Sequence, residues 1–500
     1  MFQEAAEAWR EQDYAKTIDL LERATRLDPA NVTVRLDLAR AQGLRYDYAA
    51  AEASLDQAIR ISPRLETMVE AARRCQEFGN YPLAKKFFER VLDKDPNHLE
   101  ALLPLADMLE RGHRIGEATE LIERARHRRP EDPRALVSRA RLYRLGDTLP
   151  ESERLLRQCL ALAGSDRSQR IRAWYELGMV LDRQNRFDEA MKAFLEAKSD
   201  QRPAAMNYLK ILQGIQARVR EMEESMTAEV LQRWSRGGSE LDVPKRLAIL
   251  CGHPRSGTTL LEQLLDSHPE IVTAEETHIL HDEAYLPLSR GFPANASLLE
   301  VLDSSPASRL QKSRNDYFRC TERFIAKTIG TRLLVDKNPA LNVLIPAVVR
   351  LFPEARFLVA LRDPRDVCLS CFMQPLALNP VSSAYLSIEG TVIQYVSVMG
   401  FWKVILERLP NPWMEIRYEE LVADTETASR RVLDFLDVPW DPIVLKFHEH
   451  AKTKPVRSPS YAEVIKPVYN RAIGRWKNYE KFLEPYLNRL DPFIDRLGYR

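Results

Sequence analysis

A repeat with a period of about 34 residues fills the first 203 positions and limits what this part of the chain can fold into. An aromatic or bulky apolar residue, followed three positions later by a small one, recurs at intervals of 34, 33, 34, 34 and 38 residues, from Tyr14 to Phe187. Prolines recur with nearly the same interval, from Pro29 to Pro130. Since a proline ends one helix and disfavours helix in the residue before it, each unit must be built from short helices.

Between these prolines, apolar residues are spaced as on one face of a helix. In Ile18-Asp-Leu-Leu-Glu-Arg-Ala24 they fall three and four positions apart, which predicts two short helices per unit. A period near 34 built from helix pairs resembles the tetratricopeptide repeat, and Trp174–Gly178 followed by Phe187–Ala190 is most similar to that consensus. The resemblance implies an all-α solenoid of about six helix pairs over residues 1–203, in which each unit buries its apolar face against its neighbours. Two roles fit such a solenoid: it can dock a peptide or protein, or it can serve as a rigid spacer or dimerisation element. A homodimer is therefore one possibility.

The pattern changes after the repeats. Residues 204–234 continue as an amphipathic connector, which Arg236-Gly-Gly-Ser-Glu-Leu-Asp-Val-Pro244 interrupts with turn-forming residues. We therefore expect a solenoid at 1–203, a helical connector and linker at 204–243, and a second domain at 244–500. In that domain short apolar runs alternate with helical patterns, which predicts an α/β fold with a parallel sheet. The four predicted strands are Leu247–Cys251, Leu333–Val335, Arg356–Leu361 and Trp413–Tyr418.

The segment after the first predicted strand is typical of a phosphate-binding loop. Gly252-His-Pro-Arg-Ser-Gly-Thr-Thr259 keeps the G-x-x-x-x-G spacing of a Walker A loop and leads into a helical pattern. Backbone N–H groups at such a turn, together with the positive end of the helix dipole, bind an anion. Position 258 is threonine where a nucleoside triphosphatase has lysine. The residues expected to bind the phosphate are Arg255, Ser256, Gly257, Thr258 and Thr259.

Two segments together resemble the sulfotransferases that use 3′-phosphoadenosine 5′-phosphosulfate (PAPS). Pro254-Arg-Ser-Gly-Thr-Thr-Leu260 is similar to their 5′-phosphosulfate loop, and Leu361–Ser370 is similar to their 3′-phosphate motif. The resemblance implies a P-loop-like, three-layer domain in which Arg362 and Ser370 hold the 3′-phosphate. Guanidinium and hydroxyl donors suit a doubly charged phosphate.

Further segments resemble the tyrosylprotein sulfotransferase branch of that family. Thr273-Ala-Glu-Glu-Thr277 and Val335-Asp-Lys-Asn-Pro339 are similar to segments of that branch that carry a catalytic glutamate and a catalytic lysine. The resemblance implies Glu276 as the base and Lys337 as the lysine, although the residues alone leave Glu275 and Glu276 both open as the base. Gly474-Arg-Trp476 and the residues before it are similar to the branch's nucleotide-covering segment. The remaining cofactor-binding residues that we expect are Tyr418, Ser460, Arg475 and Trp476.

The implied reaction transfers a sulfuryl group from PAPS to a hydroxyl and releases 3′-phosphoadenosine 5′-phosphate (PAP). Such transfers go in line through a charge-dispersed transition state, so positioning and electrostatics dominate. Glu276 would accept the hydroxyl proton, Lys337 would neutralise charge on the bridging oxygen, and Arg255 would hold the 5′-phosphate. No metal is expected. Two alternatives remain. One is a non-catalytic nucleotide-binding scaffold on a repeat arm, and the other is a P-loop kinase. The missing loop lysine argues against the kinase.

The composition of the chain limits the kinds of partner that it can bind. A net charge of +1 at pH 7 offers no basic excess for nucleic acid, and no apolar stretch reaches the length of a membrane span. Six irregularly spaced cysteines and a first segment unlike a signal peptide predict a cytoplasmic protein. The acceptor carries a hydroxyl. The resemblance suggests protein tyrosine in an acidic peptide docked on the repeats, but His278 stands where the animal enzymes have an arginine, so a carbohydrate, lipid or small molecule is equally open.

Overall fold

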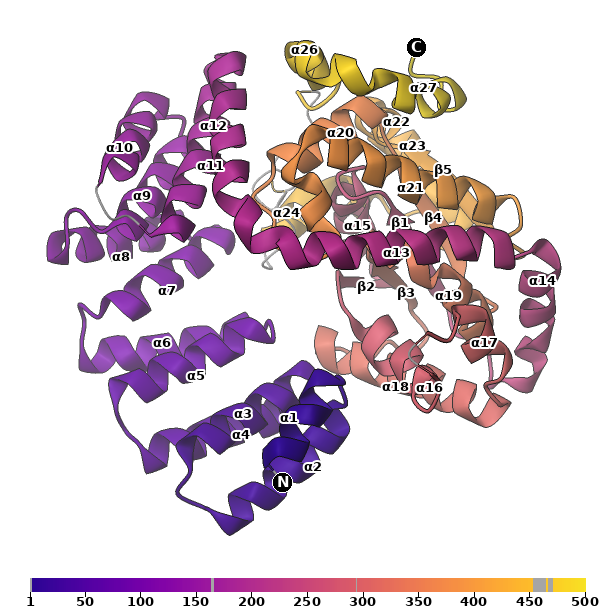
Figure 1. Cartoon of the computed structure of the whole chain (residues 1–500), viewed down its shortest axis with the longest axis horizontal. Helices are drawn as coiled ribbons and strands as arrows, with labels where there is room; N and C mark the ends of the chain where they lie inside the picture. The colour runs from indigo at the N-terminus through magenta and orange to yellow at the C-terminus, as the bar shows by residue number, and fades with distance from the viewer. Residues whose placement is uncertain (1, 163–165, 294, 453–464, 466–470) are drawn as a thin grey trace. The chain divides into compact units, whose positions relative to one another are not determined.

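The chain divides into two compact units. The computed structural model describes residues 2–162, 166–293, 295–452, 465 and 471–500 (Figure 1). The first unit is Met1–Leu155 and the second is Leu156–Arg500, so the last helix pair of the repeat region belongs to the second unit. The domain boundaries expected after residues 203 and 243 follow the sequence pattern and stay predictions.

The first unit is built from helices whose starts follow the repeat. Asp13, Asp47 and Asn80 each cap the second helix of a repeat, where the side chain accepts a hydrogen bond from the backbone N–H three residues later. Just before each such helix the chain reverses through one residue in the left-handed conformation. The residues with this conformation are Gln12, Tyr46, Gly79, His113 and Asp147.

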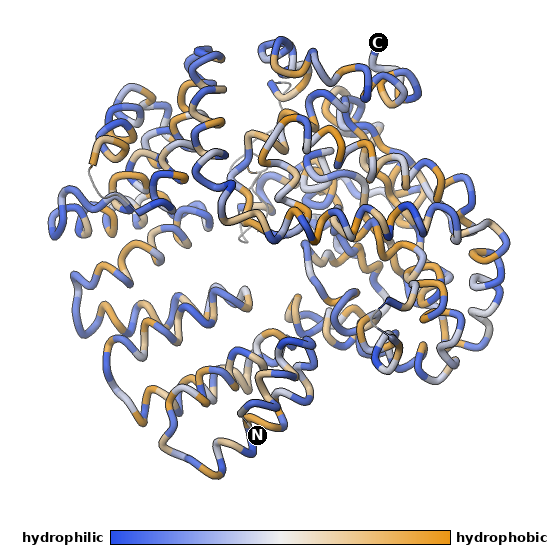
Figure 2. Tube along the Cα trace, in the orientation of Figure 1, coloured by the Kyte–Doolittle hydropathy of each residue, from blue (hydrophilic) through white to orange (hydrophobic). Residues whose placement is uncertain are grey.

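These helices pack in pairs, and the pairs from α3 onward share one core, while α1 and α2 form a second cluster with one side of α3. Helix α3 packs on α4, α5 on α6, and α7 on α8. Figure 2 shows polar and apolar residues alternating along them, as one-sided burial requires. A single cluster of buried apolar side chains runs from Leu36 to Leu142, so the core continues from one repeat into the next. The predicted all-helical solenoid is therefore confirmed. The helices that begin in this unit are α1 (Phe2–Arg10), α2 (Tyr14–Leu27), α3 (Val32–Leu44), α4 (Tyr48–Ile61), α5 (Leu65–Glu77), α6 (Tyr81–Lys94), α7 (Leu99–Arg111), α8 (Ile115–Arg128), α9 (Pro133–Leu145) and α10 (Leu149–Ala161).

Four of the ion pairs between neighbouring repeats of this unit share one spacing. Each joins an acidic residue of one repeat to a basic residue 34 positions later, on the corresponding helix of the next repeat. Pairs at a solvent-exposed surface contribute little free energy singly, so their common spacing matters more than their strength. The four pairs are Glu52 with Lys86 at 2.5 Å, Asp56 with Arg90 at 2.7 Å, Glu100 with Arg134 at 2.5 Å and Asp107 with Arg141 at 2.6 Å.

The second unit contains a five-stranded sheet in the order β2-β3-β1-β4-β5, and all of its neighbouring strands run parallel. The four predicted strands are confirmed. The sequence analysis missed a fifth strand, β2, which forms the edge beside β3. The strands are β1 (Leu247–Gly252), β2 (Ile271–Glu275), β3 (Leu333–Lys337), β4 (Arg356–Leu361) and β5 (Trp413–Arg417).

Helices cover both faces of this sheet, as predicted. On one face Leu250 and Leu358 pack with apolar side chains of α15, α23 and α24. On the other, Val359 and Leu361 lie against α21 and α27, including Trp402. The longer helices of the unit are α11 (Arg167–Arg183), α12 (Phe187–Gln201), α13 (Met206–Ser225), α14 (Ala228–Arg236), α15 (Thr258–Asp266), α18 (Ala307–Ile325), α20 (Pro364–Met373), α21 (Ile388–Leu406), α23 (Thr425–Phe435) and α27 (Leu487–Arg496). The shorter ones are η1 (Arg202–Ala205), η2 (Gly237–Glu240), η3 (Leu280–Tyr285), α16 (Leu286–Ser289), α17 (Leu298–Asp303), η4 (Leu341–Leu344), α19 (Ile345–Leu351), η5 (Ser382–Leu386), α22 (Tyr418–Ala423), η6 (Pro442–Lys446), α24 (Phe447–Ala451), η7 (Arg475–Tyr479), α26 (Glu480–Leu483) and η8 (Glu484–Tyr486).

Over the described ranges, none of the helices is both long enough and apolar enough to cross a bilayer.

Candidate active site

The loop between β1 and α15 has the backbone of an anion-binding turn. Strand β1 is buried throughout and lies between β3 and β4, where the strand order reverses and ligands of open α/β sheets bind. Gly252 ends the strand with φ 125°, and a Cβ atom there would lie 2.4 Å from the carbonyl oxygen of Ala360. Arg255 and Gly257 also have positive φ, of 70° and 91°. Positive φ at neighbouring positions of a turn is typical of backbone nests that bind anions, and here the N–H of Ser256 donates within the turn to the carbonyl oxygen of His253 at 3.2 Å.

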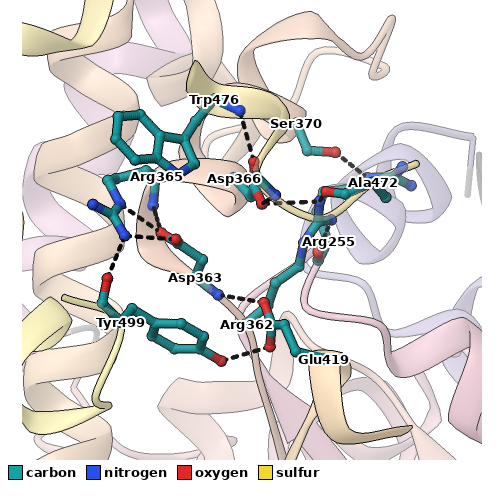
Figure 3. A network of polar contacts seen from close by, with 11 residues as sticks. Arg255, Arg362, Asp363, Arg365, Asp366, Ser370, Glu419, Ala472, Trp476 and Tyr499 are labelled. Atoms are coloured by element: carbon teal, nitrogen blue, oxygen red, sulfur yellow. Dashed lines mark hydrogen bonds and ion pairs between the residues drawn. The ribbon is translucent and has the colours of Figure 1, made fainter. Parts of the chain in front are cut away.

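Arg255 connects this loop to the second predicted phosphate motif. Its Nε donates a hydrogen bond of 3.0 Å to Oγ of Ser370, which lies on α20 (Figure 3). Arg362 follows β4, and one of its terminal nitrogens donates to the carbonyl oxygen of Arg255 at 3.2 Å. The guanidinium of Arg362 lies 4.9 Å from the ring centroid of Tyr418, and a Cβ atom on Gly257 would lie 2.6 Å from the same ring. The structure thus brings these five predicted residues together.

One donor of this group stays unused. Nε of Arg362 is buried and has no hydrogen-bond partner among the described residues. A buried donor without a partner is costly, and arginine is suited to a phosphate because it presents several donors in one plane. The group is therefore chemically fitted to an anion.

Two residues that the sequence analysis missed hold the C-terminal segment 471–479 beside Arg362. The carboxylate of Asp366 accepts hydrogen bonds from the backbone N–H of Gly474 at 2.7 Å and of Trp476 at 2.8 Å (Figure 3). Burial raises the pKa of Asp366, and the nearby Arg362 opposes that shift. Arg365 stacks on the ring of Trp476, with 4.1 Å between its guanidinium and the ring centroid. Their only sequence signal was a position within the predicted 3′-phosphate motif.

Among the other predicted cofactor-binding residues, Ser256, Thr258 and Thr259 are buried in the loop and the first turn of α15. Trp476 is buried against Arg365. The guanidinium of Arg475 lies 2.7 Å from the carboxylate of Asp182 on α11. Ser460 lies outside the described residues.

The predicted catalytic pair lies at the same edge of the sheet. Lys337 ends β3, and its neighbour in register, Glu275, ends β2. Nζ of Lys337 lies 2.8 Å from Oε1 of Glu276 and 3.3 Å from Oε1 of Glu275. The backbone N–H of Glu276 donates to the carbonyl oxygen of Lys337 at 2.8 Å and holds the two ends together. Since β3 is hydrogen-bonded to β1, the pair lies next to the anion loop.

Burial distinguishes the three side chains. Lys337 is wholly buried, the side chain of Glu275 is 10% exposed, and that of Glu276 is 39% exposed. Burial alone would lower the pKa of Lys337, but the carboxylates of Glu275, Glu276 and Glu262 outweigh it, and the net shift is upward. Lys337 therefore stays an ammonium at neutral pH, and Glu276 is the carboxylate that a ligand in solvent can reach.

Within the described parts of the chain, His, Cys, Asp and Glu side chains do not gather in threes with metal-binding geometry. Cys368 and Cys371 flank Ser370 as buried free thiols, and burial raises the pKa of Cys371 to about 12.

Family models match both halves of the chain. Residues 248–442 match the model of the sulfotransferase family, and residues 77–142 and 142–205 match tetratricopeptide-repeat models. The C-terminal half therefore contains a sulfotransferase-family domain, and the N-terminal half contains tetratricopeptide repeats.

Individual relatives cover parts of the chain at low identity. A protein-tyrosine sulfotransferase of Drosophila melanogaster is 25% identical over 325 residues, which are 62% of this chain and 60% of that protein. An uncharacterized protein of Aquifex aeolicus is 25% identical over 431 residues, which are 83% of this chain and 53% of that protein. The chain thus spans little more than half of each. The sulfotransferase domain from the curacin biosynthetic pathway is 20% identical to this chain and has a TM-score of 0.36. The match covers 52% of this chain and 99% of that domain.

Proposed function

We propose that this chain is a sulfotransferase that moves a sulfuryl group from PAPS to a hydroxyl acceptor. The observation that carries the proposal is the pairing of the wholly buried Lys337 with the exposed Glu276, at the strand edge beside the anion loop. It combines a fixed positive charge with a base that a substrate can reach. The sulfotransferase-family match over residues 248–442 supports the same reaction class.

The donor fits the group around Arg255. Arg255, the loop N–H groups and the hydroxyls of Ser256, Thr258 and Thr259 would bind the 5′-phosphosulfate. Ser370 and the unused Nε of Arg362 would bind the 3′-phosphate, and Tyr418 lies against the guanidinium of Arg362. A donor with two separate phosphate groups explains why two arginines meet here, which a single phosphate would not require.

The chemistry assigned to the chain is proton removal and charge stabilisation. When bound, PAPS supplies the sulfuryl group and leaves as PAP. Glu276 takes the proton of the acceptor hydroxyl, whose oxygen forms the new bond to sulfur as the bond between sulfur and the phosphate oxygen breaks. The electron pair of that bond stays on the phosphate oxygen. Lys337, with its raised pKa, stabilises the resulting negative charge as an ammonium rather than by giving up its proton.

The acceptor is a hydroxyl, and protein tyrosine is the first candidate to test. The relative from Drosophila melanogaster is named a protein-tyrosine sulfotransferase, and repeats of this kind suit docking of a peptide. Homodimerisation and a cytoplasmic location stay predictions from the sequence.

Replacing the proposed base tests the function. Glu276→Gln keeps the size of the side chain and one carbonyl acceptor for Lys337, but the amide cannot take the proton. We expect sulfate transfer from labelled PAPS to fall by about 10²–10⁴-fold, while PAP binding measured by calorimetry changes by less than about threefold. A tyrosine-bearing acidic peptide and the cell's own lysate serve as acceptors.

Two matched variants complete this test. Glu275→Gln separates the two adjacent glutamates, and the smaller loss is expected there because Glu275 is buried. Glu407→Gln, exposed at the end of α21, should leave transfer unchanged. Full activity in Glu276→Gln would contradict the assigned base, and a wild-type chain that binds ATP but not PAP would contradict the donor.

A further inference from the structure

A buried carboxylate of the repeat region lies at the end of α11. Asp182 is only 5% exposed, and a charged group this deeply buried requires partners. Helix α11 and its partner α12 form the last helix pair of the repeats and belong to the same compact unit as the sulfotransferase-family domain.

Among the described residues, the carboxylate of Asp182 is contacted from the C-terminal segment 471–479. A terminal nitrogen of Arg475 lies 2.7 Å from Oδ2, and its Nε donates to Oδ1 at 3.3 Å. The hydroxyl of Tyr479 donates to Oδ1 at 2.7 Å, and the guanidinium of Arg471 lies 3.9 Å from Oδ2. Four contacts from three residues, spread over nine positions, thus end on one carboxylate.

The same segment is bound on its other side to the proposed donor site. Asp366 holds the N–H groups of Gly474 and Trp476, and Arg362 donates to the carbonyl oxygen of Ala472 (Figure 3). Residues 471–479 therefore lie between a carboxylate of the repeat region and the arginine assigned to the 3′-phosphate.

Contacts from α12 support this arrangement. Phe187, the first residue of α12, packs edge-on against the ring of Tyr479, with 5.5 Å between ring centroids. Lys198 lies 5.0 Å from the ring centroid of Phe372 on α20, the helix that also carries Asp366 and Ser370. The last helix pair thus contacts both the segment and the helix to which the segment is bound.

We propose that Asp182 is a positioning residue for donor binding, which holds segment 471–479 in the conformation that receives PAPS beside Arg362. This inference rests on the proposed function. The segment is short and lacks a sheet partner, so ordering it costs conformational entropy. If the contacts with Asp182 already order the segment in the ligand-free protein, PAPS binding does not have to supply that free energy. Without Asp182 the segment is ordered in a smaller fraction of molecules, and the apparent affinity for PAPS is the intrinsic affinity multiplied by that fraction.

The test uses Asp182→Asn in the full chain. The amide keeps the shape of the side chain but loses the charge, and its NH₂ group cannot accept from Arg475 or Tyr479. We expect the Kd of PAP, measured by calorimetry, and the KM for PAPS to rise by about tenfold or more, because both depend on the ordered fraction. The kcat should stay within about threefold, since the complex that reacts has the segment in place. The backbone amides of Gly474 and Trp476 should exchange hydrogen faster in the ligand-free variant.

Asp188→Asn is the matched control. Asp188 lies on α12 and pairs with Lys481 at 2.6 Å, but both side chains are more than half exposed and neither lies in segment 471–479. This variant should keep wild-type PAP affinity and exchange rates. If Asp182→Asn unfolds, Tyr479→Phe removes a single O–H donor and should still raise the Kd of PAP measurably.

Two outcomes separate this inference from the proposed function. A wild-type chain that binds no PAP would overturn the proposed function. Hydrogen exchange at the backbone amides of Gly474 and Trp476 would still show whether Asp182 orders the segment. Wild-type PAP affinity together with wild-type exchange in Asp182→Asn and Tyr479→Phe would overturn the positioning role alone.

Discussion

Gly257 fulfils two requirements of the anion loop at once. Its φ of 91° is a conformation that other residues rarely adopt, and a Cβ atom there would meet the ring of Tyr418 at 2.6 Å. Because Tyr418 also lies against Arg362, any side chain at position 257 would displace a residue of the proposed donor site.

We therefore expect Gly257→Ala to weaken PAP binding by at least tenfold and to lower the free energy of unfolding by about 1–3 kcal/mol. Calorimetry and denaturant unfolding measure the two effects. Gly330→Ala is the control, since Gly330 has φ 60° but no heavy atom within 4 Å of its built Cβ. It should cost about 1 kcal/mol of stability and leave PAP binding unchanged. Equal PAP affinities in the two variants would argue against the contact with Tyr418.

At this scale the sequence predicted residue types better than contacts. Arg255 and Ser370 were expected to bind different phosphates, and the structure has them hydrogen-bonded to each other across 115 positions. Asp182 carried no signal, because its partner Arg475 lies 293 positions later and no local pattern marks the pair. Side chains that meet only through the tertiary fold are beyond what spacing can predict.

Helices and strands were predicted well where a period repeated. The repeat predicted the paired helices. A continuous apolar run predicted β1, and short strand-like segments alternating with helical patterns predicted β3, β4 and β5. Strand β2 was missed because its five residues, Ile271–Glu275, include threonine and glutamate and follow a helix closely. Its burial comes from its place beside β3 rather than from its own composition.

Close packing inside a helix pair explains one glycine of the repeats. A Cβ atom on Gly178 of α11 would lie 2.6 Å from the ring of Phe194 on α12, and Phe194 is wholly buried and cannot move aside. We expect Gly178→Ala to lower the free energy of unfolding by about 1–3 kcal/mol through overpacking.

The matched variant is Gly214→Ala in α13, where a built Cβ has nothing within 4 Å. Alanine has the higher helix propensity, so this change should raise stability by about 1 kcal/mol. Thermal and denaturant unfolding measure both. A loss of similar size in the two variants would show that the Phe194 contact is not the cause.

The stability of the whole molecule should depend on pH through Lys198. This lysine is 4% exposed, and burial lowers its pKa to about 7 from an ordinary value of 10.5, against a small opposing effect of Cys371. Its Nζ lies 5.1 Å and 5.0 Å from the ring centroids of Tyr175 and Phe372. Between pH 7 and 10.5 the unfolded chain keeps a proton that the folded one loses, so unfolding takes up a proton and stability rises with pH.

Lys198→Met removes this dependence. The variant should be more stable than the wild type at pH 6.5, and the difference in free energy of unfolding should shrink by about 2 kcal/mol by pH 8.5. Denaturant unfolding of both proteins at several pH values checks this, since other titrating groups cancel in the comparison. A difference that stays constant with pH would mean that Lys198 is charged throughout the range.

The four ion pairs with 34-residue spacing have a consequence for how the repeat region can change in evolution. Each pair joins positions 34 residues apart, which is one repeat period. A segment of one period that is added or lost keeps this spacing but changes which side chain faces each acidic residue. Without the repeat that carries Lys86, for example, Glu52 would face Glu120. An insertion of a few residues between two repeats would instead break the pairs that span it. The four pairs therefore join each acidic side chain to one particular neighbouring repeat, so the order of the repeats matters as well as their period.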